Sequence, residues 1–121
     1  MQNRMQDLQV LILTSDEHLG ANSRVLLASL PQANSCAIVK TVSAFNSMLH
    51  HTLDVVFVDA RELYGHKGKG LAERVANEAA LVVIARDGRD AVLAFDIEAA
   101  DCVPLPLVPS RLLTALERIG Q

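Results

Sequence analysis

Short runs of branched aliphatic residues recur along the chain and are separated by longer stretches in which apolar residues follow helical spacing. The strong runs are residues 10–13 (VLIL), 55–58 (VVFV) and 81–84 (LVVI), and the weaker ones are residues 37–39 (AIV) and 102–103 (CV). The strong runs are continuous and do not alternate with polar residues, which predicts strands buried on both faces of a parallel sheet. Five such strands predict an α/β fold.

Apolar residues at helical spacing follow these runs. They are Leu19, Leu26, Leu27 and Leu30, then Leu71, Val75 and Ala79, then Ala91, Phe95 and Ala99, and finally Leu112, Leu116 and Ile119. A shorter helix is expected over residues 43–51, and the glycine-rich stretch 64–70 is expected to be a loop. A strand followed by a helix, five times over, is typical of a three-layer α/β/α sandwich with strand order 2-1-3-4-5.

The carboxyl ends of the strands are where ligands bind in such sheets, at the point where the winding reverses. The segments expected there are residues 14–17, 59–61, 85–87 and 104–106. Pro104 and Pro106 interrupt the last strand, which predicts a short strand at an edge of the sheet.

The composition and charge of the chain argue against several classes of function. The chain has 121 residues, half of them apolar, and a formal net charge of −3, so a single domain over residues 1–121 with a polar tail at 1–8 is expected. Basic residues are scattered, which argues against direct contact with nucleic acid or with an anionic membrane. No apolar run approaches the length of a membrane span, and Cys36 and Cys102 form no metal-binding pair, so we expect a cytoplasmic protein.

Acidic residues follow two of the aliphatic runs. Asp59 ends the run 55–58, and Asp16 and Glu17 follow the first run. Carboxylates at neighbouring strand ends form a site of the kind that Mg²⁺ prefers, which makes Asp16 and Asp59 candidate metal ligands. Alternatively, Asp16 and Glu17 only cap the first helix. Asp59 has no obvious helix to cap directly after its strand.

These acids lie in segments that resemble a known family. Residues 53–59 (LDVVFVD) resemble the third strand of response-regulator receiver domains, in which the final Asp accepts a phosphoryl group from a histidine kinase. Residues 11–17 look like the first strand and acid pair of these domains, and residues 94–106 look like their fourth helix and fifth strand. Together with residues 111–116, the last segment is similar to receivers that precede LytTR-type DNA-binding domains. The resemblance implies a CheY-like (flavodoxin-like) fold and a role in two-component signalling, not an enzyme.

Most positions that perform the chemistry of receivers are substituted in this chain. Asp59 stands at the phosphoacceptor position and Asp16 at one metal-binding acid position, whereas the other positions hold Ser15 (acid), Ala85 (hydroxyl), Leu105 (lysine) and Cys102 (switch aromatic). A phosphoryl group on Asp59 would lose the charge-assisted hydrogen bond of the missing lysine, worth roughly 1.5–3 kcal/mol. The resemblance therefore implies a pseudo-receiver, in which the phosphorylation switch is broken.

Two other functions remain open from the sequence. In the first, Asp59 still accepts phosphate from a histidine kinase, with Mg²⁺ held by Asp16 and Asp59. In the second, the strand-end crevice binds a small ligand. Arg61 and Arg86 lie close enough in sequence to the acids to replace the missing cation, although a solvated surface position is the simpler expectation for each.

An interface is the last expectation from the sequence. In receivers the face formed by helix four, strand five and helix five commonly binds partners, and the residues expected on it are Phe95, Ile97, Leu105, Leu107 and Val108. Exposed together, they would form an apolar patch that marks an interface for a second copy, an output domain or a cognate signalling protein. Alternatively, Leu105 and Leu107 pack beneath the last helix.

Overall fold

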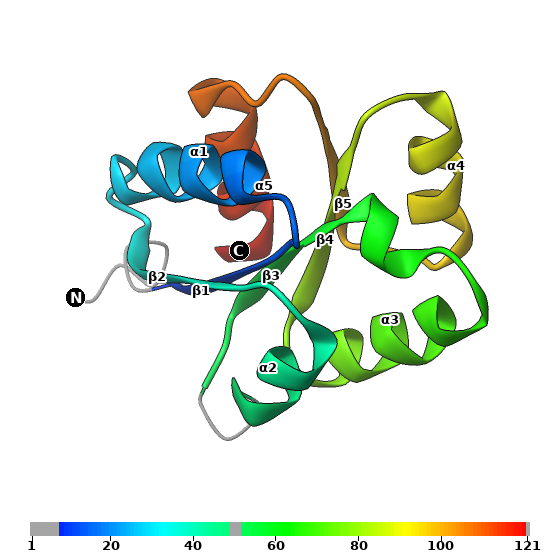
Figure 1. Cartoon of the computed structure of the whole chain (residues 1–121). Coiled ribbons are helices and arrows are strands. Elements are labelled where there is room, and N and C mark those ends of the chain that lie inside the picture. The colour runs from blue at the N-terminus through cyan, green and yellow to red at the C-terminus, as the bar shows by residue number, and fades with distance from the viewer. Residues whose placement is uncertain (1–7, 49–51, 121) are drawn as a thin grey trace.

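Five parallel strands form the central sheet of the protein, which we describe from a computed structural model that covers residues 8–48 and 52–120. The strands are β1 (Leu8–Leu13), β2 (Ala33–Val39), β3 (Val55–Asp59), β4 (Ala80–Ala85) and β5 (Asp101–Pro104). They pair in the order β2-β1-β3-β4-β5 (Figure 1). The predicted fold class and strand order are confirmed, and β5 lies at the predicted edge.

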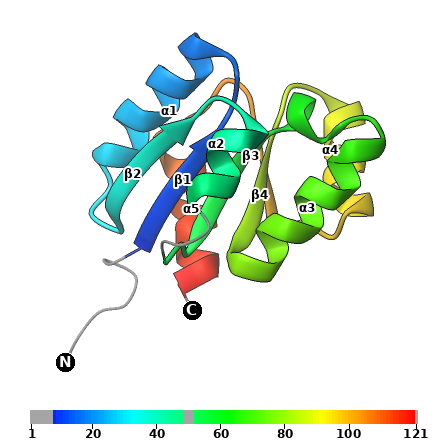
Figure 2. The ribbon, with the colours of Figure 1, turned by 60° about the horizontal axis from the view of Figure 1, so that its bottom comes forward.

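Helices cover both faces of the sheet. They are α1 (Glu17–Ala28), α2 (Val42–Ser47), α3 (His66–Glu78), α4 (Gly88–Asp96) and α5 (Pro109–Gly120), with a 3-10 helix, η3 (Ala60–Leu63), after β3. Helices α1 and α5 pack on one face, and α2, α3 and α4 pack on the other (Figure 2). None of the helices in the described residues is both long and apolar enough to span a bilayer.

Two hydrophobic cores fill the spaces between the layers because successive side chains of a strand point to opposite faces. Val10 and Ile12 of β1 pack in the core beneath α1 and α5, whereas Leu11 and Leu13 pack in the core beneath α2, α3 and α4. Strands β1, β3 and β4 therefore bury both of their faces. This burial explains why their sequences are continuous aliphatic runs.

The register of the sheet brings the carboxyl ends of β1 and β3 together. Leu13 is the partner of Val58 across this pair of strands, so the residues that follow, Thr14 and Asp59, leave the sheet side by side. Strand β4 lies on the other side of β3, where Ile84 is the partner of Asp59. The segments predicted to form the site therefore meet at the end of the sheet where the parallel strands terminate.

The glycine-rich segment is largely helical, and the prediction of a loop over residues 64–70 is wrong. Helix α3 begins at His66, and only Tyr64 and Gly65 connect it to η3. Gly68 is buried where α3 crosses η3, and a Cβ atom there would lie 1.7 Å from the carbonyl oxygen of Leu63. The glycine that suggested a loop is thus required by close helix packing.

Two other helices differ from their predicted bounds or faces. Helix α2 begins at Val42, and the end of the helix predicted over residues 43–51 lies outside the described residues. In α4 the predicted apolar face is wrong, because Phe95 is 83% exposed whereas Ala94 and Asp90 are buried. A pattern of apolar residues does not predict a buried carboxylate such as that of Asp90.

Candidate functional site

Asp59 is the buried centre of a polar cluster at the carboxyl ends of β1 and β3. Its side chain is 1% exposed, and its Oδ2 accepts a hydrogen bond of 2.8 Å from the hydroxyl of Thr14. The same hydroxyl accepts from the backbone N–H of Asp16 at 3.0 Å. Thr14, which the sequence analysis did not single out, therefore links the two acids that it did.

Asp16 serves as the cap of α1 and is also a neighbour of Asp59. Its Oδ1 accepts from the backbone N–H of Leu19 at 3.0 Å, which satisfies a free donor of the first helical turn. Its other oxygen, Oδ2, points toward the end of β3, where it meets Arg61. The helix-cap interpretation of Asp16 is thus confirmed, whereas its role as a metal ligand stays a prediction.

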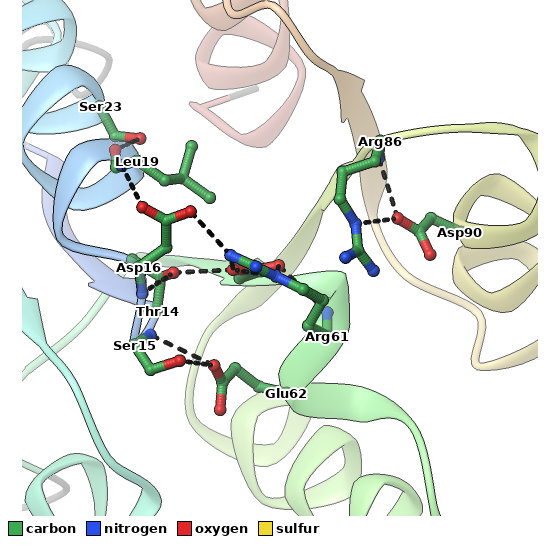
Figure 3. Close-up of polar contacts among 10 residues, drawn as sticks. Thr14, Ser15, Asp16, Leu19, Ser23, Arg61, Glu62, Arg86 and Asp90 are labelled. Atoms are coloured by element: carbon green, nitrogen blue, oxygen red, sulfur yellow. Dashed lines mark hydrogen bonds and ion pairs between the residues drawn. The ribbon is translucent and has the colours of Figure 1, made fainter.

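Arg61 joins the two carboxylates. Its Nη2 lies 2.8 Å from Oδ2 of Asp59 and 3.0 Å from Oδ2 of Asp16, and its Nε lies 3.2 Å from Oδ2 of Asp59. Figure 3 shows Arg61 reaching from the turn after β3 toward Asp16. The expectation that Arg61 is a solvated surface residue is wrong. We call Thr14, Asp16, Asp59 and Arg61 the strand-end cluster.

Asp59 also begins the 3-10 helix η3, contrary to the expectation that it has no helix to cap. Its Oδ1 accepts from the backbone N–H of Arg61 at 3.1 Å. The turn that this hydrogen bond stabilises directs the Arg61 side chain back over the carboxylate. The short helix was not visible in the sequence, because residues 60–63 show too few apolar positions for a periodic pattern.

The electrostatics of the cluster favour ionised carboxylates. Burial pushes the pKa of Asp59 upward, but the hydrogen bonds from Arg61 and Thr14 outweigh burial, so this pKa lies below its usual value. The pKa of Asp16 is lowered by the backbone N–H of Leu19 and by the side chain of Arg61. The pKa of Arg61 is raised by Asp59 and Asp16, so the guanidinium stays charged.

The strand-end cluster in this arrangement does not fit a magnesium ion. The guanidinium of Arg61 bonds to both carboxylates, at the position where an oxygen-bound cation would have to lie. Ser15, at the first of the two acid positions that the resemblance implies, supplies only a hydroxyl, which donates to Glu62 at 3.0 Å. Among the described residues there is also no group of three or more His, Cys, Asp or Glu placed to hold a metal ion.

Ala85 and Leu105 stand where the resemblance implies a hydroxyl and a lysine, and neither side chain has a polar group. Ala85 is 3% exposed at the end of β4, and Leu105 is half-buried after β5. Cys102 is half-buried in β5, where burial raises the pKa of its thiol, so the thiolate is disfavoured at neutral pH. Apolar groups thus occupy the β4 and β5 side of the crevice.

Arg86 does not reach the strand-end cluster. Its backbone N–H and its Nε donate to Oδ2 of Asp90 at 2.9 and 3.0 Å, as Figure 3 shows. The hydroxyl of Tyr64 donates to the other oxygen of Asp90 at 2.5 Å, and the guanidinium of Arg89 stacks 4.8 Å from the centre of the Tyr64 ring. This second network ties η3 to α4. The sequence analysis missed it, because Tyr64 and Asp90 are 26 residues apart.

The predicted apolar patch does not form a single surface. Phe95 and Val108 are exposed, at 83% and 45%. Leu107 is 8% exposed and packs in the core beneath α1 and α5, so the expectation that it faces outward is wrong. Leu105 is half-buried against the same core, whereas Ile97 packs against the core on the other side of the sheet. The sheet lies between these side chains, which a pattern in the sequence could not reveal.

An open depression of about 680 Å³ lies between the first turns of α1 and the segment that follows β5. Its lining includes His18, Asn22, Arg86 and Leu105, and no residue of the strand-end cluster. This depression therefore lies apart from Asp16 and Asp59.

Comparison with solved structures identifies the fold. The response regulatory domain of protein mrkE from Klebsiella pneumoniae superposes with a TM-score of 0.72 and 21% identity, covering 93% of this chain and 94% of that chain. The chain has a receiver fold. The receiver fold recurs in the signal receiver domain of an HD domain-containing protein from Pseudomonas fluorescens Pf-5, with a TM-score of 0.75 and 18% identity over 99% of this chain and 89% of that one.

A CheY-like receiver domain protein from Methanospirillum hungatei JF-1 has the same receiver fold, with a TM-score of 0.72 and 15% identity over 94% of each chain. No protein-family model and no curated protein sequence matches the chain. The likeness to these proteins therefore lies in the fold of the backbone.

Proposed function

We propose that this receiver fold serves as a protein-interaction module in signal transduction whose state does not depend on phosphorylation of Asp59. The observation behind the proposal is the Arg61 guanidinium, which bonds to both Asp59 and Asp16. A cation supplied by the chain pairs with both carboxylates, where a receiver would use a metal ion that can leave.

The hydrogen bonds of Asp59 also oppose its use as a nucleophile. Its Oδ2 accepts from Thr14 and from the guanidinium, and its Oδ1 accepts from the backbone N–H of Arg61. Donation of a lone pair to a phosphorus atom requires that at least one oxygen lose these partners. In addition, Ala85 and Leu105 offer no donor to a phosphoryl oxygen, so the modified state would gain little in return.

As a module of this kind, the protein would bind other proteins and would have no catalytic activity of its own. The exposed apolar side chain of Phe95, on α4, supports a docking role for the surface of that helix. A second copy, an output domain and a cognate signalling protein are the partners that the proposal allows. LytTR-type regulators are the output class that the sequence resemblance favours.

The test is an amide-resolved NMR titration with Mg²⁺ and beryllofluoride, a mimic of the aspartyl phosphate. We expect no shifts around Asp59 in the native chain. In Arg61→Ala the carboxylates are free of the guanidinium, so we expect Mg²⁺ to perturb the amides near Asp16 and Asp59. The matched control is the double variant Arg61→Ala, Asp59→Ala, which should show no such response.

The phosphoacceptor alternative predicts the opposite result. Shifts in the native chain that begin at Asp59, extend to α4 and β5, and disappear in Asp59→Ala would restore the phosphorylation switch and would disprove the proposal.

A small-ligand sensor is the second candidate, favoured by the open depression of about 680 Å³ between α1 and the segment that follows β5. A ligand that binds only the folded state raises the melting temperature, and the rise grows with the logarithm of its concentration once it exceeds the Kd. Thermal shifts would therefore be measured with a panel of metabolites on the native chain and on Leu105→Trp, which fills the depression. A shift that is present in the first and lost in the second supports this candidate.

A further inference from the structure

A groove with an apolar floor lies between α3 and α4, on the face of the sheet that is opposite α1 and α5. The two helices are neighbours in both Figure 1 and Figure 2. The groove encloses about 790 Å³ and is open to solvent. The apolar part of its lining comprises Leu63, Ala72, Ala76, Leu93 and Ile97. No function assigned to the strand-end crevice uses this surface.

The sequence of α3 creates the groove in two ways. Gly68 allows the first turn of α3 to lie directly against η3, because any Cβ atom there would overlap the carbonyl oxygen of Leu63. Further along the helix, the side facing α4 presents two alanines, Ala72 and Ala76, one turn apart. Larger side chains at these positions would fill the space between the helices, so the cavity results directly from small residues.

Uncompensated negative charge surrounds the apolar floor. Glu73, Asp96 and Glu98 line the groove together with a single cation, Lys69. Within residues 8–48 and 52–120, none of these four side chains forms an ion pair or a hydrogen bond. Asp16, Asp59, Asp90 and Asp101, in contrast, are each paired with an arginine. The groove thus gathers three unpaired acids around one apolar floor.

The shape of the groove favours a protein segment as its occupant. A groove between two helices suits an amphipathic helix, whose apolar residues at i, i+3, i+4 and i+7 enter the floor while its flanks meet the rim. The acidic rim requires that these flanks be basic.

We infer that the α3–α4 groove binds a basic amphipathic helix of a partner protein, with its apolar face on Ala72, Ala76 and Leu93 and its Lys or Arg side chains toward Glu73, Asp96 and Glu98. This inference rests on the proposed function only in assuming a protein partner. It requires neither phosphorylation nor its absence, so the two proposals can fail separately.

The test uses synthetic helical peptides of about 15 residues, long enough to form a helix on contact. One peptide combines leucine with lysine, and its matched partner has glutamate in place of every lysine. We expect the lysine peptide to bind, with NMR shifts confined to the amides of α3, α4 and η3. We expect the glutamate peptide to bind at least about tenfold more weakly, because like charges would face each other across the rim.

Charge reversal in the groove supplies the decisive variants. The double variant Glu73→Lys, Asp96→Lys should weaken binding of the lysine peptide by about tenfold or more. The control is Glu78→Lys, an exposed position on the same helix that does not line the groove, and it should leave the affinity within about twofold. Equal losses in both variants, or shifts centred on Phe95 and Val108, would overturn the inference.

Glu98 offers a variant in which binding and stability are expected to change in opposite directions. It has a φ of 57°, a left-handed conformation that glycine and asparagine adopt more easily than glutamate. Glu98→Asn should therefore raise the melting temperature while it weakens binding of the lysine peptide. Unchanged affinity in this variant and in the double variant would show that the rim does not recognise basic flanks.

The outcome also separates this inference from the proposed function. Peptide binding that follows the rim charges, together with beryllofluoride shifts at Asp59, would retain the groove and reject the pseudo-receiver. No peptide binding in a chain that ignores beryllofluoride would reject the groove alone.

Discussion

Arg61 donates to Asp59 from its backbone and from its side chain at the same time. The backbone N–H lies 3.1 Å from Oδ1 and Nη2 lies 2.8 Å from Oδ2. Because the two residues are separated by one position, the capped turn of η3 presents the guanidinium to the carboxylate with little loss of chain entropy. The turn therefore holds the Arg61 guanidinium beside the carboxylate, so the positive charge of this site comes from the chain and not from a metal ion.

Arg61→Ala should destabilise the fold. The variant leaves the buried Asp59 carboxylate with the Thr14 hydroxyl and the backbone N–H as its partners. Loss of one member of a buried ion pair destabilises by several kcal/mol, but water can reach this site because the Arg61 side chain is 40% exposed. We expect a decrease of about 1–3 kcal/mol in the free energy of unfolding, measured by urea denaturation.

The control for this prediction is a double-mutant cycle with Asp59→Ala. When Asp59 is already absent, removal of Arg61 should cost much less than it does in the native chain. Additive effects of the two substitutions would mean that the ion pair contributes nothing to stability.

Stability should fall at acidic pH through Asp90. Burial raises the pKa of this carboxyl, but Tyr64 and Arg86 outweigh burial and lower the pKa from 3.8 to about 2. A carboxyl with a lowered folded pKa stabilises the fold above its unfolded value, and this stabilisation is lost as the pH falls toward the folded value. The loss is about 2 kcal/mol between pH 4 and 2.

Urea denaturation at a series of pH values would measure this effect. In Asp90→Asn the pH dependence between pH 4 and 2 should be shallower than in the native chain, and Tyr64→Phe should be intermediate because Arg86 still pairs with the carboxylate. Identical slopes in all three chains would show that Asp90 does not contribute.

Two glycines of α3 should respond to alanine in opposite directions. Gly68→Ala places a Cβ 1.7 Å from the carbonyl oxygen of Leu63, so the helix must shift away from η3, at a loss of about 2–3 kcal/mol. At Gly70 the nearest neighbour of a new Cβ is the Arg74 side chain at 3.7 Å, which leaves room for it. Gly70→Ala should therefore stabilise α3 by about 0.5–1 kcal/mol. Melting curves of the two variants would show whether the signs differ.

Two phenylalanines provide a test of the exposed surface. Phe45, on α2, is fully buried, whereas Phe95, on α4, is 83% exposed. Phe45→Ala should lower the free energy of unfolding by about 3–5 kcal/mol, and Phe95→Ala should change it by less than about 0.5 kcal/mol. If Phe95 belongs to an interface, its variant should instead weaken self-association in sedimentation experiments. A large loss of stability in Phe95→Ala would place this side chain in the core.

The layered architecture was predictable because it depends on patterns that are local in the chain. Continuous apolar runs such as residues 55–58 are typical of strands that are covered on both faces. The rules for connections between parallel strands leave few possible topologies for this order of strands and helices. The neighbourhood of Asp16 and Asp59 followed from the same reasoning, because Asp16 follows β1 and Asp59 ends β3, and these two strands are adjacent in the predicted order.

The ion pairs and hydrogen bonds of the site could not be predicted, because they depend on the three-dimensional structure. Whether Arg61 faces Asp59 or solvent is decided by the single turn of η3, and burial of Asp90 is decided by Tyr64, which lies 26 residues away. Likewise, apolar spacing predicted that Phe95 is buried, whereas the packing of α4 exposes it. Hydrophobic periodicity indicates which apolar residues are buried. A polar residue can also be buried when partners distant in the sequence form hydrogen bonds or ion pairs with it. Only the folded chain brings those partners together.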